Sequence, residues 1–304
     1  MRLAAVDIGS NAIRLQITHV TPYDGQLNFK KVEYVRFPLR LGHDVFNFRK
    51  LSPETSGKFV KLMQAFKLMI DLYEVEDYYA CATSAMREAE NGNEMVHVVK
   101  EMTGMEIKII SGKKEAGIIN LAINQHLDDT TFIHIDVGGG STELNIYHEK
   151  EKIASKSFNI GTVRNLEHHE SPKVWGKMEK WINKKLNTIE VKSIQAIGTG
   201  GNINKLFDVA KKRENRNGNS FTLDQLMETR DYIAEFSLKE RISFLQLNED
   251  RADVIIPASN IYISVMNWAK AVNMVVPDVG LKDGIMHMLY EKSISKREKE
   301  KKQE

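Results

Sequence analysis

Three short glycine-containing turns each follow an apolar run, and together they could do chemistry on an anion. The turns cover residues 7–11, 136–142 and 198–201. Glycine lets the backbone approach a ligand closely, and successive backbone N–H groups in such turns form a concavity that binds anions. One turn of this kind is often only a tight hairpin, whereas three of them indicate a phosphate site. Side-chain donors in the first two turns would add to it: Ser10, Asn11, Ser141 and Thr142.

Acidic residues lie in or beside two of these turns, where a bound phosphate would repel them. A divalent cation resolves this conflict, because Mg²⁺ prefers carboxylate oxygens and neutralises phosphate oxygens. Asp136 and Glu143 are therefore predicted to hold a metal ion or to position water, and the alternative is that they hydrogen-bond the turn itself. For Asp7 the sequence leaves metal binding and a turn-internal role equally open.

Two arginines and one glutamate could complete a phosphate site. Arg87 ends a segment of small hydroxylic residues and suits bidentate phosphate capture, or else is a surface helix charge. Arg14 follows the first turn and is either a second phosphate ligand or a charge at a strand edge. Glu115 lies near the start of an expected helix. A carboxylate there can act as a general base on water, although an acid in a first turn also complements the helix dipole.

Hydrophobic periodicity indicates the elements that must position these groups. Short apolar or alternating runs are expected to form strands at 3–8, 14–20, 78–82, 107–110, 131–137, 143–148, 152–158 and 193–197. Helices are expected at 53–73, capped by Ser52, and at 93–102, 115–126 and 254–268. Strands that alternate with helices indicate an α/β protein, and the opening strand–turn–strand pattern recurs from residue 131. The charged end, 296–304, is expected to be frayed.

Length and composition exclude several classes of protein. The chain has 304 residues, 42% of them hydrophobic and 28% charged, with a net charge of +2, which is typical of a globular protein of about two domains. Its one cysteine, Cys81, cannot form an intrachain disulfide and is expected to be a buried structural thiol. The sequence contains neither a membrane-spanning run nor a signal-peptide core, so a cytoplasmic location is expected. The balanced charge predicts neither a nucleic-acid nor a membrane partner.

Six segments, in this order, resemble the exopolyphosphatase/guanosine-pentaphosphate phosphatase (Ppx/GppA) family of the actin and sugar-kinase superfamily. They are VDIGSNAIRL (6–15), ATSAMREAEN (82–91), IISGKKEA (109–116), IDVGGGSTEL (135–144), AIGTGGNINKL (196–206) and VGLKDGIMHMLY (279–290). The resemblance implies an α/β fold of two ribonuclease-H-like, actin-like ATPase lobes with the active site in a cleft between them. The lobes would be 1–124 and 125–304, with the last helix, 283–295, packing back on the first lobe.

The resemblance also implies a role for each matching residue. The family's catalytic glutamate falls on Glu115, and its metal-associated acids, which hold Mg²⁺ or Mn²⁺, fall on Asp136 and Glu143. Its phosphate contacts fall on Ser10, Asn11, Arg87, Gly138, Gly139, Gly140, Ser141 and Thr142, with Gly200 and Gly201 in a further loop. Many members carry two glutamates where this chain has Lys114 and Glu115. Lys114 could strengthen anion binding, or could lower the pKa of Glu115 and make it a weaker base.

The expected activity is release of terminal orthophosphate from inorganic polyphosphate. The same chemistry on pppGpp is a second reading, which needs a guanine pocket that the sequence does not locate. A kinase or ATPase of the wider superfamily is a third, disfavoured because segments 83–87 and 111–115 match the phosphatase branch. A non-catalytic binder of polyphosphate or nucleotide is a fourth, motivated by Lys114. A homodimer is expected because the family often dimerises.

Overall fold

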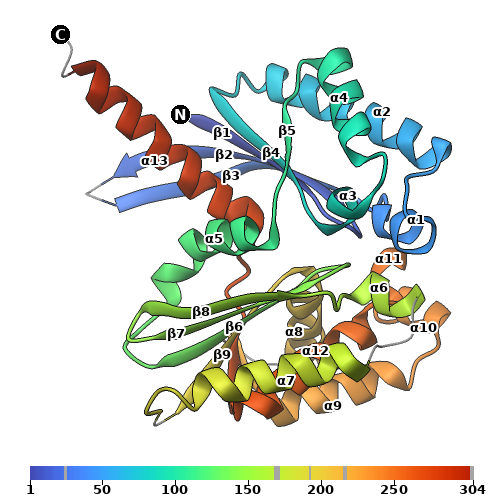
Figure 1. Ribbon diagram of the computed structural model, residues 1–304, viewed down its shortest axis with the longest axis vertical. Coiled ribbons are helices and arrows are strands. Elements are labelled where there is room, and N and C mark those ends of the chain that lie inside the picture. The colour runs from blue at the N-terminus through green and yellow to red at the C-terminus, as the bar shows by residue number, and fades with distance from the viewer. Residues whose placement is uncertain (24–25, 168–171, 192, 215–217, 302–304) are drawn as a thin grey trace. The chain divides into compact units, whose positions relative to one another are not determined.

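A computed structural model describes the chain except for residues 24–25, 168–171, 192, 215–217 and 302–304. The chain divides into two compact units, each built around one mixed β-sheet (Figure 1). Unit 1 comprises Met1–Ile123 and Gly280–Glu304, and unit 2 comprises Asn124–Val279. No helix in the described part of the chain combines the length and the apolar character needed to cross a bilayer.

The sheet of unit 1 has five strands in the order β3-β2-β1-β4-β5. The first three strands are antiparallel neighbours, whereas β4 and β5 continue the sheet in parallel with β1. The central strand β1 is buried on both faces, as expected for a strand covered by helices. The strands are β1 (Arg2–Ile8), β2 (Ile13–Tyr23), β3 (Gln26–Phe37), β4 (Asp77–Ala82) and β5 (Ile107–Ile109).

Among the helices of unit 1, α2 begins at the cap that the sequence predicts. The Ser52 side chain accepts a hydrogen bond from the Thr55 N–H and Pro53 occupies the first turn of α2, as predicted. The last helix, α13, packs against α5, β1 and β2. The helices are α1 (Leu41–Phe48), α2 (Pro53–Leu72), α3 (Ser84–Glu88), α4 (Gly92–Thr103), α5 (Gly112–Ile123) and α13 (Leu281–Lys301).

The sheet of unit 2 has six strands in the order β10-β11-β9-β6-β7-β8. They are β6 (Thr131–Val137), β7 (Thr142–His148), β8 (Glu151–Phe158), β9 (Ile194–Thr199), β10 (Ser220–Thr222) and β11 (Asn273–Val275). Around them lie η1 (Asn124–His126), α6 (Thr162–Glu167), α7 (Pro172–Leu186), α8 (Gly201–Glu214), α9 (Leu223–Ala234), α10 (Leu238–Ser243), α11 (Glu249–Ala252) and α12 (Ile255–Ala269). The almost wholly apolar α12 is the centre of the core and packs against α7, α8 and α9.

The two sheets share one plan. Strands β6, β7, β8, β9 and β11 repeat the order, the antiparallel start and the parallel continuation of β1 to β5, and β10 is an addition at the edge. The internal duplication predicted from the recurring strand–turn–strand pattern is therefore present. The predicted α/β class, with two units that each hold a mixed sheet, is confirmed.

Several parts of the chain differ from the sequence-based expectation. Strand β3 and the helices α1, α3, α6 and α7 were not predicted. Strand β3 is an edge strand with exposed Val32 and Tyr34 beside exposed lysines, so it lacks a clear apolar face. The charged end is not frayed from residue 296, because α13 continues to Lys301 and residues 302–304 lie outside the described part. Lysine, glutamate and arginine are good helix formers, so a charged run can extend a helix that is already anchored.

Candidate active site

The first glycine turn joins β1 to β2, and an ion pair closes it. Asp7 and Arg14 are directly opposite in the antiparallel register, and Arg14 Nη1 lies 2.9 Å from Asp7 Oδ2. Both side chains are mostly buried, with exposed fractions of 22% for Arg14 and 11% for Asp7. This pairing compensates the charge of Asp7 inside unit 1 and favours the turn-internal role for Asp7 over the metal role. It equally gives Arg14 a structural partner in addition to its predicted contact with phosphate.

Helix α3 holds the same turn from the other side. The Ser10 hydroxyl lies 2.8 Å from the Ser84 hydroxyl and accepts the Ala85 N–H at 3.2 Å. At the other end of α3, Arg87 Nη1 donates to the Ile110 carbonyl at 2.7 Å. Helix α3 thereby links the first turn to the segment that leads into α5, and the Arg87 guanidinium has further N–H groups that suit an anion.

Glu115 lies in the first turn of α5 and is buried, with an exposed fraction of 9%. Cys81 is opposite Asp7 in the parallel register of β1 and β4. The pKa of its thiol depends on the charged groups around it. Burial raises the pKa of Cys81 well above its ordinary value, and the charges of Asp7 and Glu115 raise it further. Unit 1 therefore gathers Asp7, Cys81 and Glu115 in one neighbourhood. The expected buried structural thiol is confirmed, since a thiol with a raised pKa is a poor nucleophile.

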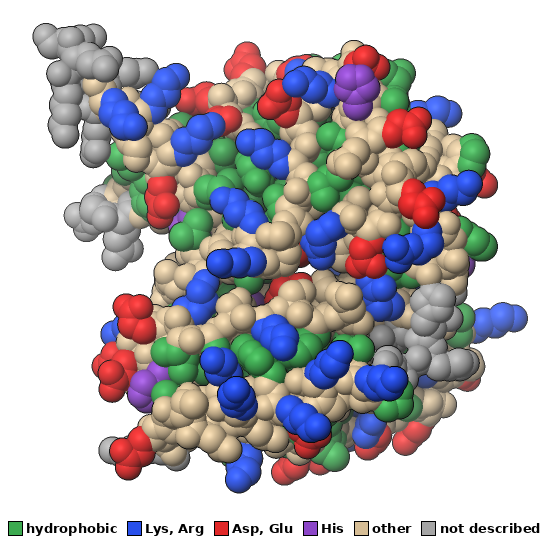
Figure 2. All heavy atoms as spheres, in the orientation of Figure 1, with side chains coloured by type: hydrophobic (Ala, Val, Ile, Leu, Met, Phe, Trp, Pro, Cys, Tyr) green, Lys and Arg blue, Asp and Glu red, His purple; other side chains and the backbone are tan. Residues whose placement is uncertain are grey.

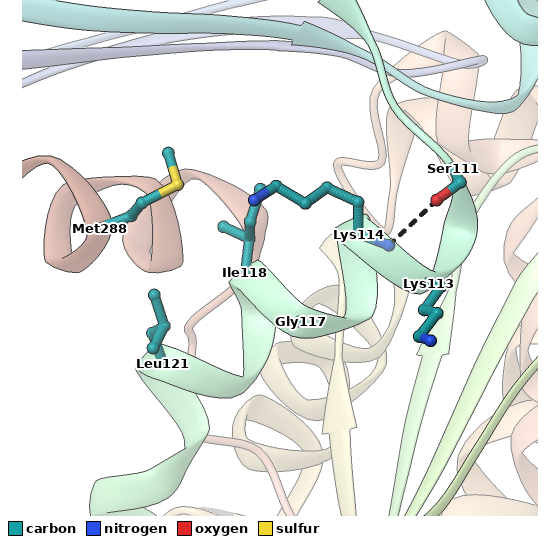
Figure 3. A pocket seen from close by; sticks show the side chains of 7 residues that line it. All are labelled: Ser111, Lys113, Lys114, Gly117, Ile118, Leu121 and Met288. Atoms are coloured by element: carbon teal, nitrogen blue, oxygen red, sulfur yellow. Dashed lines mark hydrogen bonds between the residues drawn. The ribbon is translucent and has the colours of Figure 1, made fainter.

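Lys114 extends along α5 and away from the side of the helix that carries Glu115. Figure 3 shows its side chain reaching toward Ile118 and Met288 over a shallow cavity between α5 and α13, whereas Lys113 points to the opposite side. Glu115 is buried with residues three and four positions further along the helix, and Lys114 is exposed. The departure from the family pattern at Lys114 thus adds a positive charge on the α13 side of α5.

The second glycine turn, in unit 2, joins β6 to β7 and places two acids opposite each other. Asp136 and Glu143 are direct partners in the antiparallel register, so their side chains leave the same face of the sheet. Glu143 is buried, and its Oε1 accepts hydrogen bonds of 2.8 Å from the hydroxyls of Ser141 and Ser157. These two hydroxyls fix the orientation of the Glu143 carboxylate, and facing carboxylates favour a cation between them.

If a divalent cation binds at this pair, two carboxylates would suit magnesium or manganese, whereas zinc would need further protein ligands. Among the residues that the structure describes, no group of three or more His, Cys, Asp or Glu side chains could hold a metal ion. Zinc sites use three or four such protein ligands. Magnesium is usually held by one or two carboxylates together with water and substrate phosphate oxygens. Asp136 and Glu143 supply that number of carboxylates, so a metal here would share its remaining positions with water and phosphate.

The backbone of the second turn is fixed by α6, which leaves the turn its anion-binding shape. Gly138 and Gly139 accept backbone hydrogen bonds from the N–H groups at the start of α6, and Arg164 Nε donates to the Gly140 carbonyl at 2.7 Å. A Cβ at Gly161 would lie 2.5 Å from the backbone of Gly140, so only glycine allows this close approach. The Thr142 hydroxyl donates to the Ile160 carbonyl at 2.7 Å.

The third glycine turn follows β9 and lies against Asp136 within unit 2. Gly200 has φ +103°, and a Cβ there would lie 3.1 Å from Asp136 Oδ1. The Tyr262 hydroxyl donates to the Thr199 carbonyl at 2.6 Å, and Arg251 Nη1 donates to the Gly201 carbonyl at 2.6 Å. The structure therefore brings the predicted phosphate residues of segments 136–143 and 198–201 together, as three strand ends of one sheet.

A buried polar network lies two register steps below this pair of acids, on the same face of the sheet. His134 is fully buried, with Nδ1 2.9 Å from the Asn145 amide nitrogen and Nε2 2.9 Å from the Thr199 hydroxyl. Because the amide nitrogen can only donate, Nδ1 accepts and Nε2 carries the hydrogen. Burial lowers the pKa of His134 to about 3, with a smaller contribution from Lys152, so this imidazole is neutral.

Sequence reasoning missed the residues that hold the turns from a distance. They are His134, Gly161, Arg164, Arg251 and Tyr262. Their partners are mostly backbone carbonyls from other elements, and no local spacing marks such contacts. A signal existed only at Gly161, a glycine that directly follows the expected strand at 152–158.

Comparison with known proteins connects this geometry to one family. A sequence profile of the Ppx/GppA phosphatase family matches residues 20–293. The chain is 28% identical over 287 residues to a bifunctional 3-dehydroquinate synthase/phosphatase of Fusobacterium nucleatum, covering 87% of this chain and 43% of that protein. It is 26% identical to exopolyphosphatase 1 of Mycobacterium tuberculosis, covering 54% of this chain and 47% of that protein. The chain spans about half the length of these two curated relatives.

Solved structures show the same fold over nearly the whole chain. The Aquifex aeolicus member of the Ppx/GppA family superposes with a TM-score of 0.75 at 26% identity, covering 96% of this chain and 98% of that one. An exopolyphosphatase from Cytophaga hutchinsonii superposes with a TM-score of 0.81 at 21% identity, with the same coverage.

Proposed function

Because the chain belongs to the Ppx/GppA phosphatase family, we propose that it hydrolyses phosphoanhydride bonds and releases terminal orthophosphate from inorganic polyphosphate. The observation that carries this proposal is the facing pair Asp136 and Glu143 beside a glycine turn that α6 fixes in shape. Two carboxylates next to an anion-binding turn would suit a divalent cation that binds together with phosphate. Relatives named exopolyphosphatase support polyphosphate as the substrate class.

In the proposed reaction, the terminal phosphate binds at the glycine turns of unit 2. Backbone N–H groups of segment 138–141 and the third turn hold its oxygens, and Arg87 contributes a charged donor. Asp136 and Glu143 would hold a Mg²⁺ ion, whose chemistry there would be to neutralise part of the phosphate charge. Glu115 accepts a proton from the attacking water, whose oxygen forms the new bond to the terminal phosphorus. The bridging P–O bond breaks, and the bridging oxygen leaves with the shortened chain.

The proposal draws its parts from both units. The general base belongs to unit 1, whereas the phosphate turns and the metal-holding acids belong to unit 2. Substitution of Glu115 in unit 1, and likewise of Asp136 or Glu143 in unit 2, is expected to lower turnover strongly.

Phosphate release by the full chain with Mg²⁺ tests this function. The substrates are long-chain polyphosphate, tripolyphosphate, pppGpp and ATP, and the variant is Glu115→Gln. We expect release from polyphosphate, with kcat lowered by about 10²–10⁴-fold in the variant, the usual contribution of a general base. Glu94→Gln is the matched control, because Glu94 lies in the first turn of α4 and is exposed.

Three results would contradict the proposal. Release from pppGpp alone would assign the chain to the guanosine-nucleotide branch of the chemistry. Full activity of the Glu115→Gln variant would show that Glu115 is not the general base. Tight binding of polyphosphate without any turnover by the folded wild-type chain would make the protein a binder.

A further inference from the structure

Helix α7 of unit 2 carries four lysines in a single line. Lys173, Lys177, Lys180 and Lys184 are all exposed and are three or four residues apart. At about 100° per residue this spacing places them within one narrow stripe of the helix, about 17 Å long. We call these four residues the α7 lysine stripe. In Figure 2, lysine and arginine side chains gather over α7 on the face in view.

The opposite side of α7 anchors the stripe to the core of unit 2. Met178, Ile182 and Leu186 are buried, and the Trp181 ring packs edge-to-face on Phe158 of β8 at 5.8 Å. The stripe therefore sits on a rigid support that does not depend on the lysines themselves. Lys156 of β8, whose ammonium lies 5.1 Å from the Phe158 ring centre, extends the positive surface toward the sheet.

These lysines differ from those on α2 in their partners. On α2, Lys58 pairs with Glu54 and Lys67 with Asp71, four residues away in each case. No carboxylate of the described residues forms an ion pair with the α7 lysine stripe, and α7 carries only one acid, Glu179, on another side of the helix. Two of the three lysines on α2 are paired with an acid of the same helix, whereas none of the four lysines of the stripe has an ion pair with a described carboxylate.

The course of the chain connects the stripe with the proposed phosphate site. Helix α6 packs on the second glycine turn, and α7 follows α6 before the chain returns to the start of β9. Since β9 is parallel to β6, α7 runs back along the sheet, and Lys173 is at the end of α7 that lies with the turn. A linear polyanion that leaves the turn could continue along the stripe.

We propose that the α7 lysine stripe is an exosite for linear inorganic polyphosphate, which holds the distal part of a chain whose terminal phosphate occupies the glycine turns. The exosite rests on the proposed function for the identity of its ligand. Polyphosphate has one negative charge on each phosphate unit along an unbranched chain, and it matches a straight row of ammonium groups by charge alone. The stripe contains no aromatic side chain that would stack a base, which favours polyphosphate over single-stranded nucleic acid.

The test replaces all four lysines by glutamine in the full chain, since glutamine preserves helix propensity. Binding of end-labelled long-chain polyphosphate is measured at several salt concentrations, with Glu115→Gln in every protein so that no turnover interferes. We expect the affinity to fall at least about tenfold. The slope of log affinity against log salt concentration should become less steep by about 3, because each of the four lost phosphate contacts contributes about 0.7 to it. The control replaces Lys58, Lys61, Lys67 and Lys100 by glutamine, which changes net charge equally and should leave binding unchanged.

Turnover gives a second readout. With Glu115 restored, the α7 variant should keep its kcat and KM on tripolyphosphate, which is too short to reach along the stripe, and should show a raised KM on long chains. Unchanged affinity and salt slope for long chains would overturn the exosite, as would an equal loss in the α2 and α4 control. Stripe-dependent binding of single-stranded DNA that is tighter than that of polyphosphate would also overturn it. A chain that binds through the stripe but hydrolyses nothing would retain the exosite and refute the proposed function.

Discussion

The hairpins β1–β2 and β6–β7 have the same place in their two units but opposite electrostatics. In unit 1, Asp7 is opposite Arg14 and forms an ion pair with it, whereas in unit 2 the equivalent Asp136 is opposite Glu143. The first pair is neutral as a whole, and the second concentrates negative charge beside an anion-binding turn. The residue opposite the aspartate, Arg14 in unit 1 and Glu143 in unit 2, thus distinguishes a turn closed by an ion pair from a turn that suits a divalent cation.

The next cross-strand pair on the same face, two register steps away, shows the same divergence. Ala5 is opposite Gln16 in unit 1, and His134 is opposite Asn145 in unit 2. Unit 2 builds a buried polar network that reaches the Thr199 hydroxyl and so supports the third glycine turn. Unit 1 places the small Ala5 at the equivalent position and holds its turn through Ser10 and α3 instead. Equivalent backbones are therefore stabilised by different means, and in unit 2, unlike unit 1, two acids are opposite each other beside the turn.

Removing the charge from the acidic pair should have the largest effect. Glu143→Gln keeps the size of the side chain and an oxygen that can accept from Ser141 and Ser157, but removes the charge that a metal would need. We expect Mg²⁺-dependent phosphate release to fall by about 10²–10³-fold, since metal neutralisation contributes several kcal/mol. Glu149→Gln, at the exposed end of the same hairpin, should be fully active. Full activity of the Glu143→Gln variant would show that Glu143 has no role in the reaction.

Breaking the ion pair of unit 1 should reduce stability. Arg14→Met retains the aliphatic length of the side chain and leaves the buried Asp7 without its 2.9 Å partner. We expect the free energy of unfolding at pH 7 to fall by about 3 kcal/mol in urea titrations, as for other mostly buried pairs that lose one member. The double variant Asp7→Asn/Arg14→Met should regain most of that loss. Equal stability of the wild type and both variants would show that the pair has no structural role.

The sequence predicted the class, the duplication and the segments of the site, because apolar strands that end in glycine turns are local patterns. It could not decide between a metal ligand and a turn-internal role for Asp7, because the deciding contact with Arg14 depends on strand register. The contacts of Arg164 and Arg251 with turn carbonyls were missed for a similar reason, since they join elements distant in sequence. Strand β3 was missed because an exposed edge strand needs no apolar face.

The buried histidine of unit 2 should make stability depend on pH. The pKa of His134 is about 3 in the folded protein, so between its ordinary value of 6.5 and 3 the unfolded chain binds a proton that the folded chain does not. Stability from this residue is complete above pH 6.5 and falls as pH decreases, by about 2 kcal/mol between pH 6.5 and 5. His134→Gln should flatten the pH dependence of unfolding in this range, and exposed His97→Gln should not. The same slope in His134→Gln as in the wild type would contradict the neutral, buried imidazole.

The most direct test of the difference between the hairpins is the affinity of the chain for Mn²⁺, measured by electron paramagnetic resonance on two equivalent substitutions. Asp136→Asn and Asp7→Asn change the same residue type at the same place in the two units. We predict that Asp136→Asn weakens Mn²⁺ binding by about tenfold or more, whereas Asp7→Asn leaves it unchanged. Equal weakening by both substitutions, or loss with Asp7→Asn alone, would contradict the assignment of the cation site to unit 2.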